Sequence, residues 1–63
     1  MCLSAAYTVR QDTETLICKF VSQIEVLDGV VALTDVMGSR TEIPGELFAV
    51  DLINNTVKIR VDA

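Results

Sequence analysis

Apolar and polar residues alternate with a period of two along most of the chain, the pattern of strands with one buried face. This pattern predicts strands over residues 3–10, 16–26, 30–36, 40–43, 47–53 and 56–61. No window keeps a period of 3.6 residues, so no helix longer than two turns is expected. Six or seven short strands with tight turns predict an all-β fold, a small single-domain curled sheet or open β-barrel.

Turn-forming residues separate these segments. Asp28-Gly29 suits the positive φ of a tight hairpin, and Asn54-Asn55 predicts a second hairpin turn. Pro44-Gly45 interrupts the strand pattern, because proline cannot donate to a sheet ladder. Ser22-Gln23 indicates a bend or bulge, at which Val21 could turn inward.

The alternation also predicts which strands are buried. Residues 30–36 are β-branched and apolar, and they should form the most buried strand. The last strand alternates cleanly, and its inward residues are Val57, Ile59 and Val61.

Cys18 lies on the apolar face of its strand, between Leu16 and Phe20. A free cysteine packs as a small hydrophobe, so Cys18 is expected in the core beside these two residues. The other aromatic residues, Tyr7 and Phe48, also lie at positions that the pattern assigns to the interior.

The size of the chain limits its stability. Its 63 residues, of which 51% are hydrophobic and 22% charged, make one domain over residues 1–63 with a small core. Domains of this size usually gain stability from disulfides, a metal or a partner subunit. Two cysteines allow at most one disulfide. The excess of apolar residues therefore favours association, and a homodimer is expected.

The charge of the chain argues against nucleic acid as a partner. Nine acidic and five basic residues give a net charge of −4, and the basic residues are dispersed. No apolar run is long enough to cross a membrane, and the N-terminus lacks the features of a secretory signal. We therefore expect a cytoplasmic protein, in which thiols are reduced and a Cys2–Cys18 disulfide does not form.

The residue types present argue against an enzyme. The chain has no histidine, which removes the usual general base, the serine triads and the commonest zinc sites. Its three glycines stand singly at turns, so no phosphate-binding loop is present. The aspartates lie near turns and strand ends, where such residues ordinarily face solvent.

Cys2 is the one residue with a claim to chemistry, as a metal ligand. If Met1 is removed, the amine and thiolate of Cys2 would close a five-membered chelate ring on a metal ion. If Met1 stays, its amine and the Cys2 amide nitrogen could join the thiolate. One chain then offers two or three donors, and two adjacent N-termini would offer a fuller set. Such donors suit Ni(II) or Cu(II), while thiolates also favour softer ions.

The opening Met1-Cys2-Leu3-Ser4, followed by a strand containing Tyr7, resembles the start of the CooT-like family of small proteins. Further segments resemble the family in the same order, namely Ile24-Glu25-Val26, Asp28-Gly29-Val30, Leu33-Thr34-Asp35-Val36-Met37-Gly38 and Val50-Asp51-Leu52. The resemblance covers about residues 1 to 60, and the start is its most specific part.

The resemblance implies a cytoplasmic homodimer that binds Ni(II) through Cys2. The role that it implies is a metallochaperone or nickel sensor in the maturation of carbon monoxide dehydrogenase, with that enzyme or its maturation factors as partners. Only Cys2 carries over as a ligand. Because the chain has no histidine-rich tail, nickel storage by a tail is not expected.

Two other functions stay open at this point. Maturation chaperones of the HypC type also begin Met-Cys-Leu, but they usually continue with a Pro-Gly pair, and this chain has no proline before Pro44. Members of the CooT-like family are also labelled predicted RNA-binding proteins. A small RNA-binding β module would need exposed aromatic residues beside basic ones, and the acidic balance gives it no support.

Overall fold

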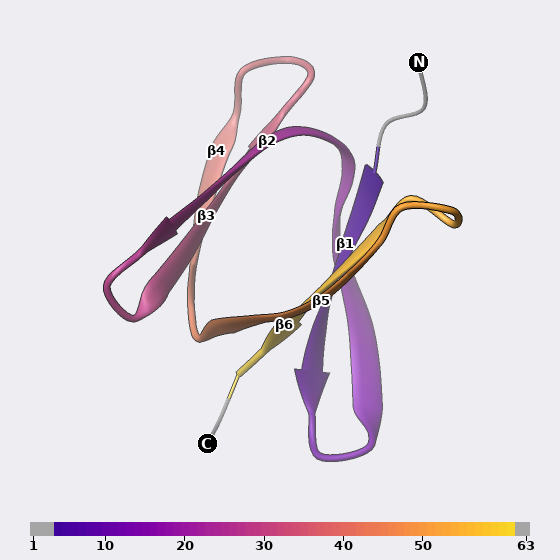
Figure 1. Ribbon diagram of the computed structural model, residues 1–63. Coiled ribbons are helices and arrows are strands. Elements are labelled where there is room, and N and C mark those ends of the chain that lie inside the picture. Colours follow the sequence, from indigo (N-terminus) through magenta and orange to yellow (C-terminus); the bar gives the residue numbers. More distant parts are fainter. Residues whose placement is uncertain (1–3, 62–63) are drawn as a thin grey trace.

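The computed structural model describes residues 4–61, and within them it contains strands and turns without any helix. The six strands are β1 (Ser4–Arg10), β2 (Thr13–Leu27), β3 (Val30–Asp35), β4 (Arg40–Pro44), β5 (Glu46–Asp51) and β6 (Thr56–Arg60). They form one sheet, in the order β4-β3-β2-β1-β6-β5, that curls into a half-barrel (Figure 1). The prediction of an all-β curled sheet or open barrel is confirmed.

The first and last strands lie beside each other near the middle of the sheet. β1 pairs in parallel with β6, whereas the other neighbouring strands are antiparallel. The chain passes from edge strand β4 to edge strand β5 through Gly45 alone. There the Gly45 amide donates to the Gly29 carbonyl over 3.0 Å. A Cβ at Gly45 would overlap the carbonyl oxygen of Arg60, so this corner requires glycine.

The core lies inside the curl and consists of the buried side chains of Ala6, Val21, Val31, Leu33, Val57 and Ile59. Strand β3 is the most buried, as predicted, and β6 buries Val57 and Ile59, with Val61 half-buried against the core. The predicted bulge is also present. The β2–β3 register shifts between Val21 and Gln23, and Val21 turns into the core.

The prediction for the middle of β2 is wrong in part. Cys18 is half-buried against the core, but Leu16 is 42% exposed and Phe20 is 57% exposed. The β1–β2 register shifts twice, once on each side of the Ala6–Cys18 pair. Each shift adds a residue to β2 and reverses the face on which later side chains lie. Simple alternation therefore fails over this stretch.

The prediction that Phe48, on edge strand β5, is buried is wrong as well. Phe48 is half-exposed, because the β5–β6 register shifts between Leu47 and Ala49. The Arg60 guanidinium lies 4.4 Å from the centre of the Phe48 ring, a cation–π contact. Tyr7 is half-buried.

Both predicted hairpins are present. The first turns at Asp28-Gly29, where Gly29 has φ 73°. The second is longer than expected, since β5 ends at Asp51 and the turn spans residues 52–55. Asn55 takes the positive φ, at 55°.

Candidate metal-binding end of the half-barrel

Cys2, the predicted metal ligand, lies outside the described residues. What the structure gives is the end of the sheet at which the chain begins. Ser4 is the first residue that the structure describes, and the residues around it form this end of the sheet.

Strand register places Ser4 in the middle of a row that crosses five strands. On one side Ser4 pairs with Val21, which pairs with Asp35. On the other side Ala5 pairs with Thr56, which pairs with Asp51. The β3–β4 turn follows Asp35 and the β5–β6 turn follows Asp51, so β1 begins between these two turns (Figure 1).

The β3–β4 turn is held by the side chain of Asp35. Its Oδ1 accepts hydrogen bonds from the amides of Met37 (2.9 Å) and Ser39 (3.0 Å). This is the local side-chain-to-backbone bonding by which aspartate favours turns. Ser22 at the bulge of β2 supports the same turn, since its Oγ lies 3.1 Å from the carbonyl oxygens of Thr34 and Asp35.

The β5–β6 turn is held in the same way by Asp51. Its Oδ1 accepts from the amides of Ile53 and Asn54, each over 3.0 Å, and its Oδ2 accepts from Asn54 Nδ2 over 2.8 Å. These bonds, the one from the Asn54 amide first, hold the pKa of Asp51 below its usual range. Asp51 therefore stays ionised, and the turn stays bonded, at neutral pH.

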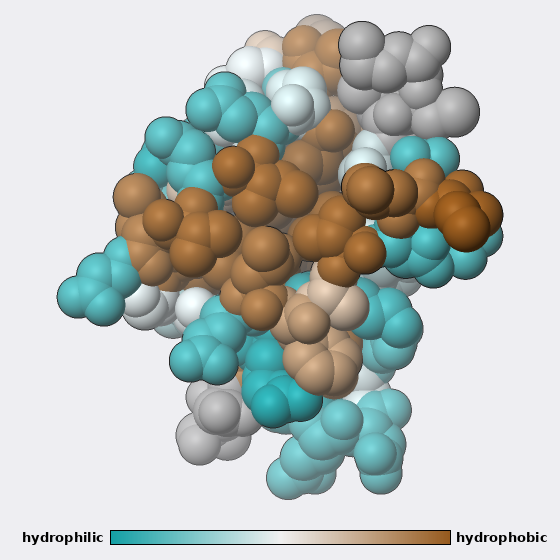
Figure 2. Space-filling view, in the orientation of Figure 1, coloured by the Kyte–Doolittle hydropathy of each residue, from teal (hydrophilic) through white to brown (hydrophobic). Residues whose placement is uncertain are grey.

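Each turn carries two apolar side chains into solvent. The exposed fractions are 56% for Val36, 86% for Met37, 83% for Leu52 and 90% for Ile53. Phe20 lies beside the first turn, since its carbonyl accepts from the Val36 amide over 2.9 Å. Figure 2 shows apolar atoms over the β3–β4 turn at the top and at the tip of the β5–β6 turn on the right.

The described residues contain no cluster of candidate metal ligands. Within residues 4–61, no group of three or more Cys, Asp or Glu side chains could hold a metal ion. Cys18 is a free thiol, and burial, followed by the negative charge of Asp35, raises its pKa. A raised pKa favours the thiol over the thiolate that metals bind, so Cys18 is suited to packing.

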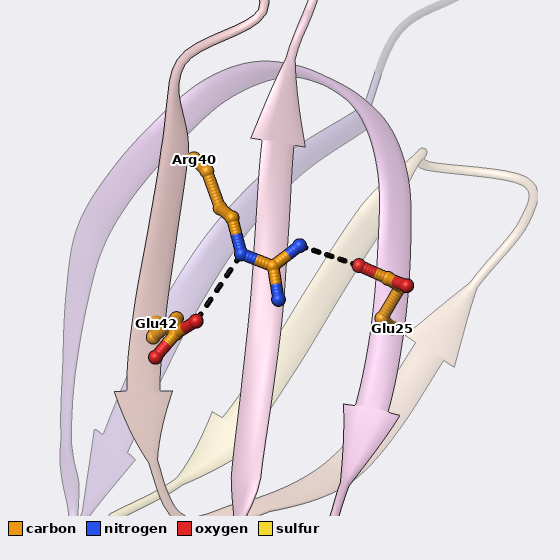
Figure 3. A network of polar contacts seen from close by, with 3 residues as sticks. All are labelled: Glu25, Arg40 and Glu42. Carbon is orange, nitrogen blue, oxygen red and sulfur yellow. Dashed lines mark hydrogen bonds and ion pairs between the residues drawn. The ribbon is translucent and has the colours of Figure 1, made fainter.

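The main ion-pair network lies on the outer face of the sheet and is centred on Arg40, the first residue after the β3–β4 turn. Arg40 of β4 reaches across β3 and bonds to Glu25 of β2 over 2.5 Å and to Glu42 over 3.2 Å (Figure 3). Glu25 and Glu42 flank Ala32 of β3, which is buried. Each charged side chain is about half exposed, so water weakens both ion pairs. We regard the network as structural.

A groove of about 530 Å³ lies near the opposite end of β1. Its lining includes Phe48 and Arg60, the aromatic-basic pair that RNA binding would use, together with Asp12 and Glu14. Asp12 repels phosphate, and the Glu14 carboxylate neutralises Lys58 over 2.9 Å, so the groove does not have the charge of an RNA-binding surface.

These features define a small β half-barrel whose described residues contain no group of three or more metal-ligating side chains, and whose candidate ligand, Cys2, precedes them in the sequence. The family model of CooT, the CO dehydrogenase accessory protein, matches residues 1–60, and the chain belongs to this family. The resemblance found in the sequence is confirmed, and the protein is a member of a family of accessory proteins.

The fold is also found in a solved structure. A crystal structure described as that of a CooT from Carboxydothermus hydrogenoformans superposes on this chain with a TM-score of 0.86 at 19% sequence identity. The match covers 98% of this chain and 100% of that one. At this identity the match establishes the shared fold. A search of curated proteins finds no match. No helix of the described residues is long and apolar enough to cross a membrane.

Proposed function

We propose that this protein binds Ni(II) through Cys2 at the interface of a homodimer and acts as a metallochaperone or nickel sensor in the maturation of carbon monoxide dehydrogenase. The observation that carries the proposal is the match to the CO dehydrogenase accessory family over residues 1–60, which includes Cys2. The client is then the dehydrogenase or another of its maturation factors.

The donor chemistry supports nickel. A thiolate with neighbouring amine and amide nitrogens suits the square-planar geometry that Ni(II) takes. One chain supplies only two or three of these donors, and the described residues offer no acidic or cysteine cluster to complete the set. A second chain start would supply the missing donors, which is why the proposal includes a dimer.

The test is a titration of Ni(II) into the reduced protein, followed by thiolate-to-metal charge-transfer absorption. We expect saturation at one nickel per two chains. Saturation at one nickel per chain would reject the shared site and leave Cys2 as a ligand. Absence of the absorption band would reject metal binding at the thiolate.

RNA binding is the alternative that the exposed Phe48–Arg60 pair makes worth testing. We expect no salt-sensitive binding of single-stranded RNA at physiological salt, because the chain has a net charge of −4 and carboxylates line the groove. Fluorescence anisotropy with labelled RNA measures this. A submicromolar complex that weakens with salt and with Arg60→Ala would instead favour the RNA-binding function.

A HypC-type chaperone, whose cysteine engages a partner enzyme, is the remaining alternative. It differs from the nickel proposal because binding of the partner enzyme would depend on Cys2 even when no metal is present, and this dependence can be measured.

A further inference from the structure

We propose that the concave face of the half-barrel, on the side of the β2–β3 hairpin, is a docking surface for an amphipathic helix of a partner protein that carries lysine or arginine residues beside its apolar stripe. This surface begins beyond Val21, which pairs with Ser4, and extends toward the Asp28-Gly29 turn. It is separate from the candidate metal-binding end, and the proposal does not depend on nickel.

The first support is apolar surface that the sheet leaves uncovered. A sheet with one apolar face ordinarily buries that face against a second layer, but residues 4–61 form a single curled sheet. The curl fully buries its central side chains, among them Val31 and Ile59. Register partners share a face of the sheet, and five neighbours of these central residues on the concave face are only partly covered. These five residues, which we call the open apolar face, are Ile24, Val26, Ile43, Leu47 and Val50.

The most exposed member of the open apolar face is Val26, at 62%, and Leu47 and Val50 are 38% and 45% exposed. Figure 2 shows apolar atoms across the middle of the molecule, between the β2–β3 turn on the left and β5. A contiguous apolar surface of this kind marks an interaction site.

The second support is the separation of charge between the two faces of the sheet. No member of the open apolar face is charged. The charged side chains of the same strands lie on the outer face, where Glu25 and Glu42 flank Ala32 and bond to Arg40. The occupant of the concave face therefore has to present apolar side chains to it.

The edges of the sheet favour a helix over an added strand. Edge strand β4 ends in Pro44, which cannot donate to a ladder, and edge strand β5 has a bulge at Phe48. Both features interrupt the edge that an extended peptide would join. A helix needs only the apolar face, on which side chains at positions i, i+3, i+4 and i+7 can pack.

The acidic residues beside this face favour a basic helix. Asp28 precedes Gly29 and Glu46 follows Gly45, and the hydrogen bond between the two glycines brings both acidic residues to one corner. Within residues 4–61 neither carboxylate forms an ion pair. Arg60 is the register partner of Glu46, but its guanidinium is engaged in the cation–π contact. Together with the net charge of −4, this corner attracts lysine and arginine and repels an acidic helix.

The test uses a fluorescent synthetic peptide of about 14 residues, in which leucine and lysine alternate with the period of a helix, so that it is roughly 20 Å long when folded. Fluorescence anisotropy measures its binding to the parent chain. We expect one peptide per chain, bound at least about tenfold tighter than two controls. The first control has glutamate in place of lysine, and the second has leucine and lysine in strict alternation, the period of a strand.

Val26→Asn and Leu27→Asn are matched variants, because these neighbours lie on opposite faces of β2. Val26 pairs with buried Val31 on the concave face, whereas Leu27 pairs with Val30 on the outer face and is 47% exposed. We expect Val26→Asn to weaken binding of the helical lysine peptide by about tenfold and Leu27→Asn to leave it within about twofold of the parent chain. Equal effects of the two substitutions would overturn the site.

A measurement on the parent chain keeps the proposal testable if a variant does not fold. The methyl signals of Val26, Leu47 and Val50 in an NMR spectrum should shift when the helical lysine peptide is added, and those of Leu27 should not. The opposite pattern would overturn the site.

Three further outcomes would overturn the choice of occupant. Tighter binding of the strictly alternating peptide would mean that a strand is added to the sheet. Equal binding of the glutamate peptide would remove the role of charge. If Val26→Asn left peptide binding unchanged but dissociated the chain from its own copies in sedimentation equilibrium, a second copy would be what covers this face.

Discussion

The Cys2→Ser chain is expected to keep the fold and lose tight nickel binding, with an affinity lower by about a hundredfold or more. Serine keeps the size of cysteine, but its hydroxyl does not ionise near neutral pH and is a poor ligand for Ni(II). Isothermal titration and the charge-transfer band measure the loss. Circular dichroism should be unchanged, since residues 4–61 form the sheet without Cys2.

Cys18→Ser is the matched control for this experiment. Cys18 packs against the core, and its raised pKa favours the neutral thiol, so nickel stoichiometry should stay as in the parent chain. The expected cost is a small loss of stability. If Cys2→Ser bound nickel as tightly as the parent chain, the metal site would be wrong and a partner-binding role of the HypC kind would remain.

Gly45→Ala is expected to lower the free energy of unfolding by about 2–3 kcal/mol, a large part of the roughly 5 kcal/mol available to a small domain. The added Cβ would overlap the carbonyl oxygen of Arg60 and lie 3.2 Å from Val61 Cγ1. Backbone cannot move aside as a flexible side chain does, so the β4–β5 corner or the end of β6 must shift. Urea unfolding followed by circular dichroism measures the change.

Gly29→Ala separates this overlap from the cost of backbone conformation. Gly29 has φ 73°, and a Cβ there would meet nothing within 4 Å, so the expected loss is about 1–2 kcal/mol from conformation alone. The steric account of the corner would be contradicted if Gly45→Ala cost less than Gly29→Ala.

The sequence predicts the parts of the fold in which alternation is uninterrupted. Val57 and Ile59 are buried as expected, and β3 is the most buried strand, because no extra residue disturbs these strands. The prediction fails where β2 gains residues opposite β1, which exposes Leu16 and Phe20. A bulge depends on two strands at once, so it cannot be found from the alternation of one strand.

The candidate site, like the fold, can be predicted from the sequence only in part. Cys2 can be chosen from the sequence, because residue type and family resemblance suffice for it. The position of the two apolar turns beside the start of β1 cannot, since only strand register shows that Asp35 and Asp51 end one row around Ser4. The repeated order of an aspartate followed by two apolar residues, at 35–37 and 51–53, is the signal that the sequence did contain.

The parallel pairing of β1 with β6 determines when this protein can fold. Strand β1 lies between β2 and β6, so one of its edges stays unpaired until residues 56–60 have been synthesised. Contacts between such distant parts of a chain form slowly, because loop-closure entropy is lost before they form. The hydrogen bond that the Ala5 amide donates to the Asn55 carbonyl, over 2.9 Å, likewise forms only after Asn55 has been synthesised. A ribosome-bound chain that ends before residue 56 therefore lacks β6, and the end of the sheet around Ser4 can form only after residues 56–60 have been synthesised.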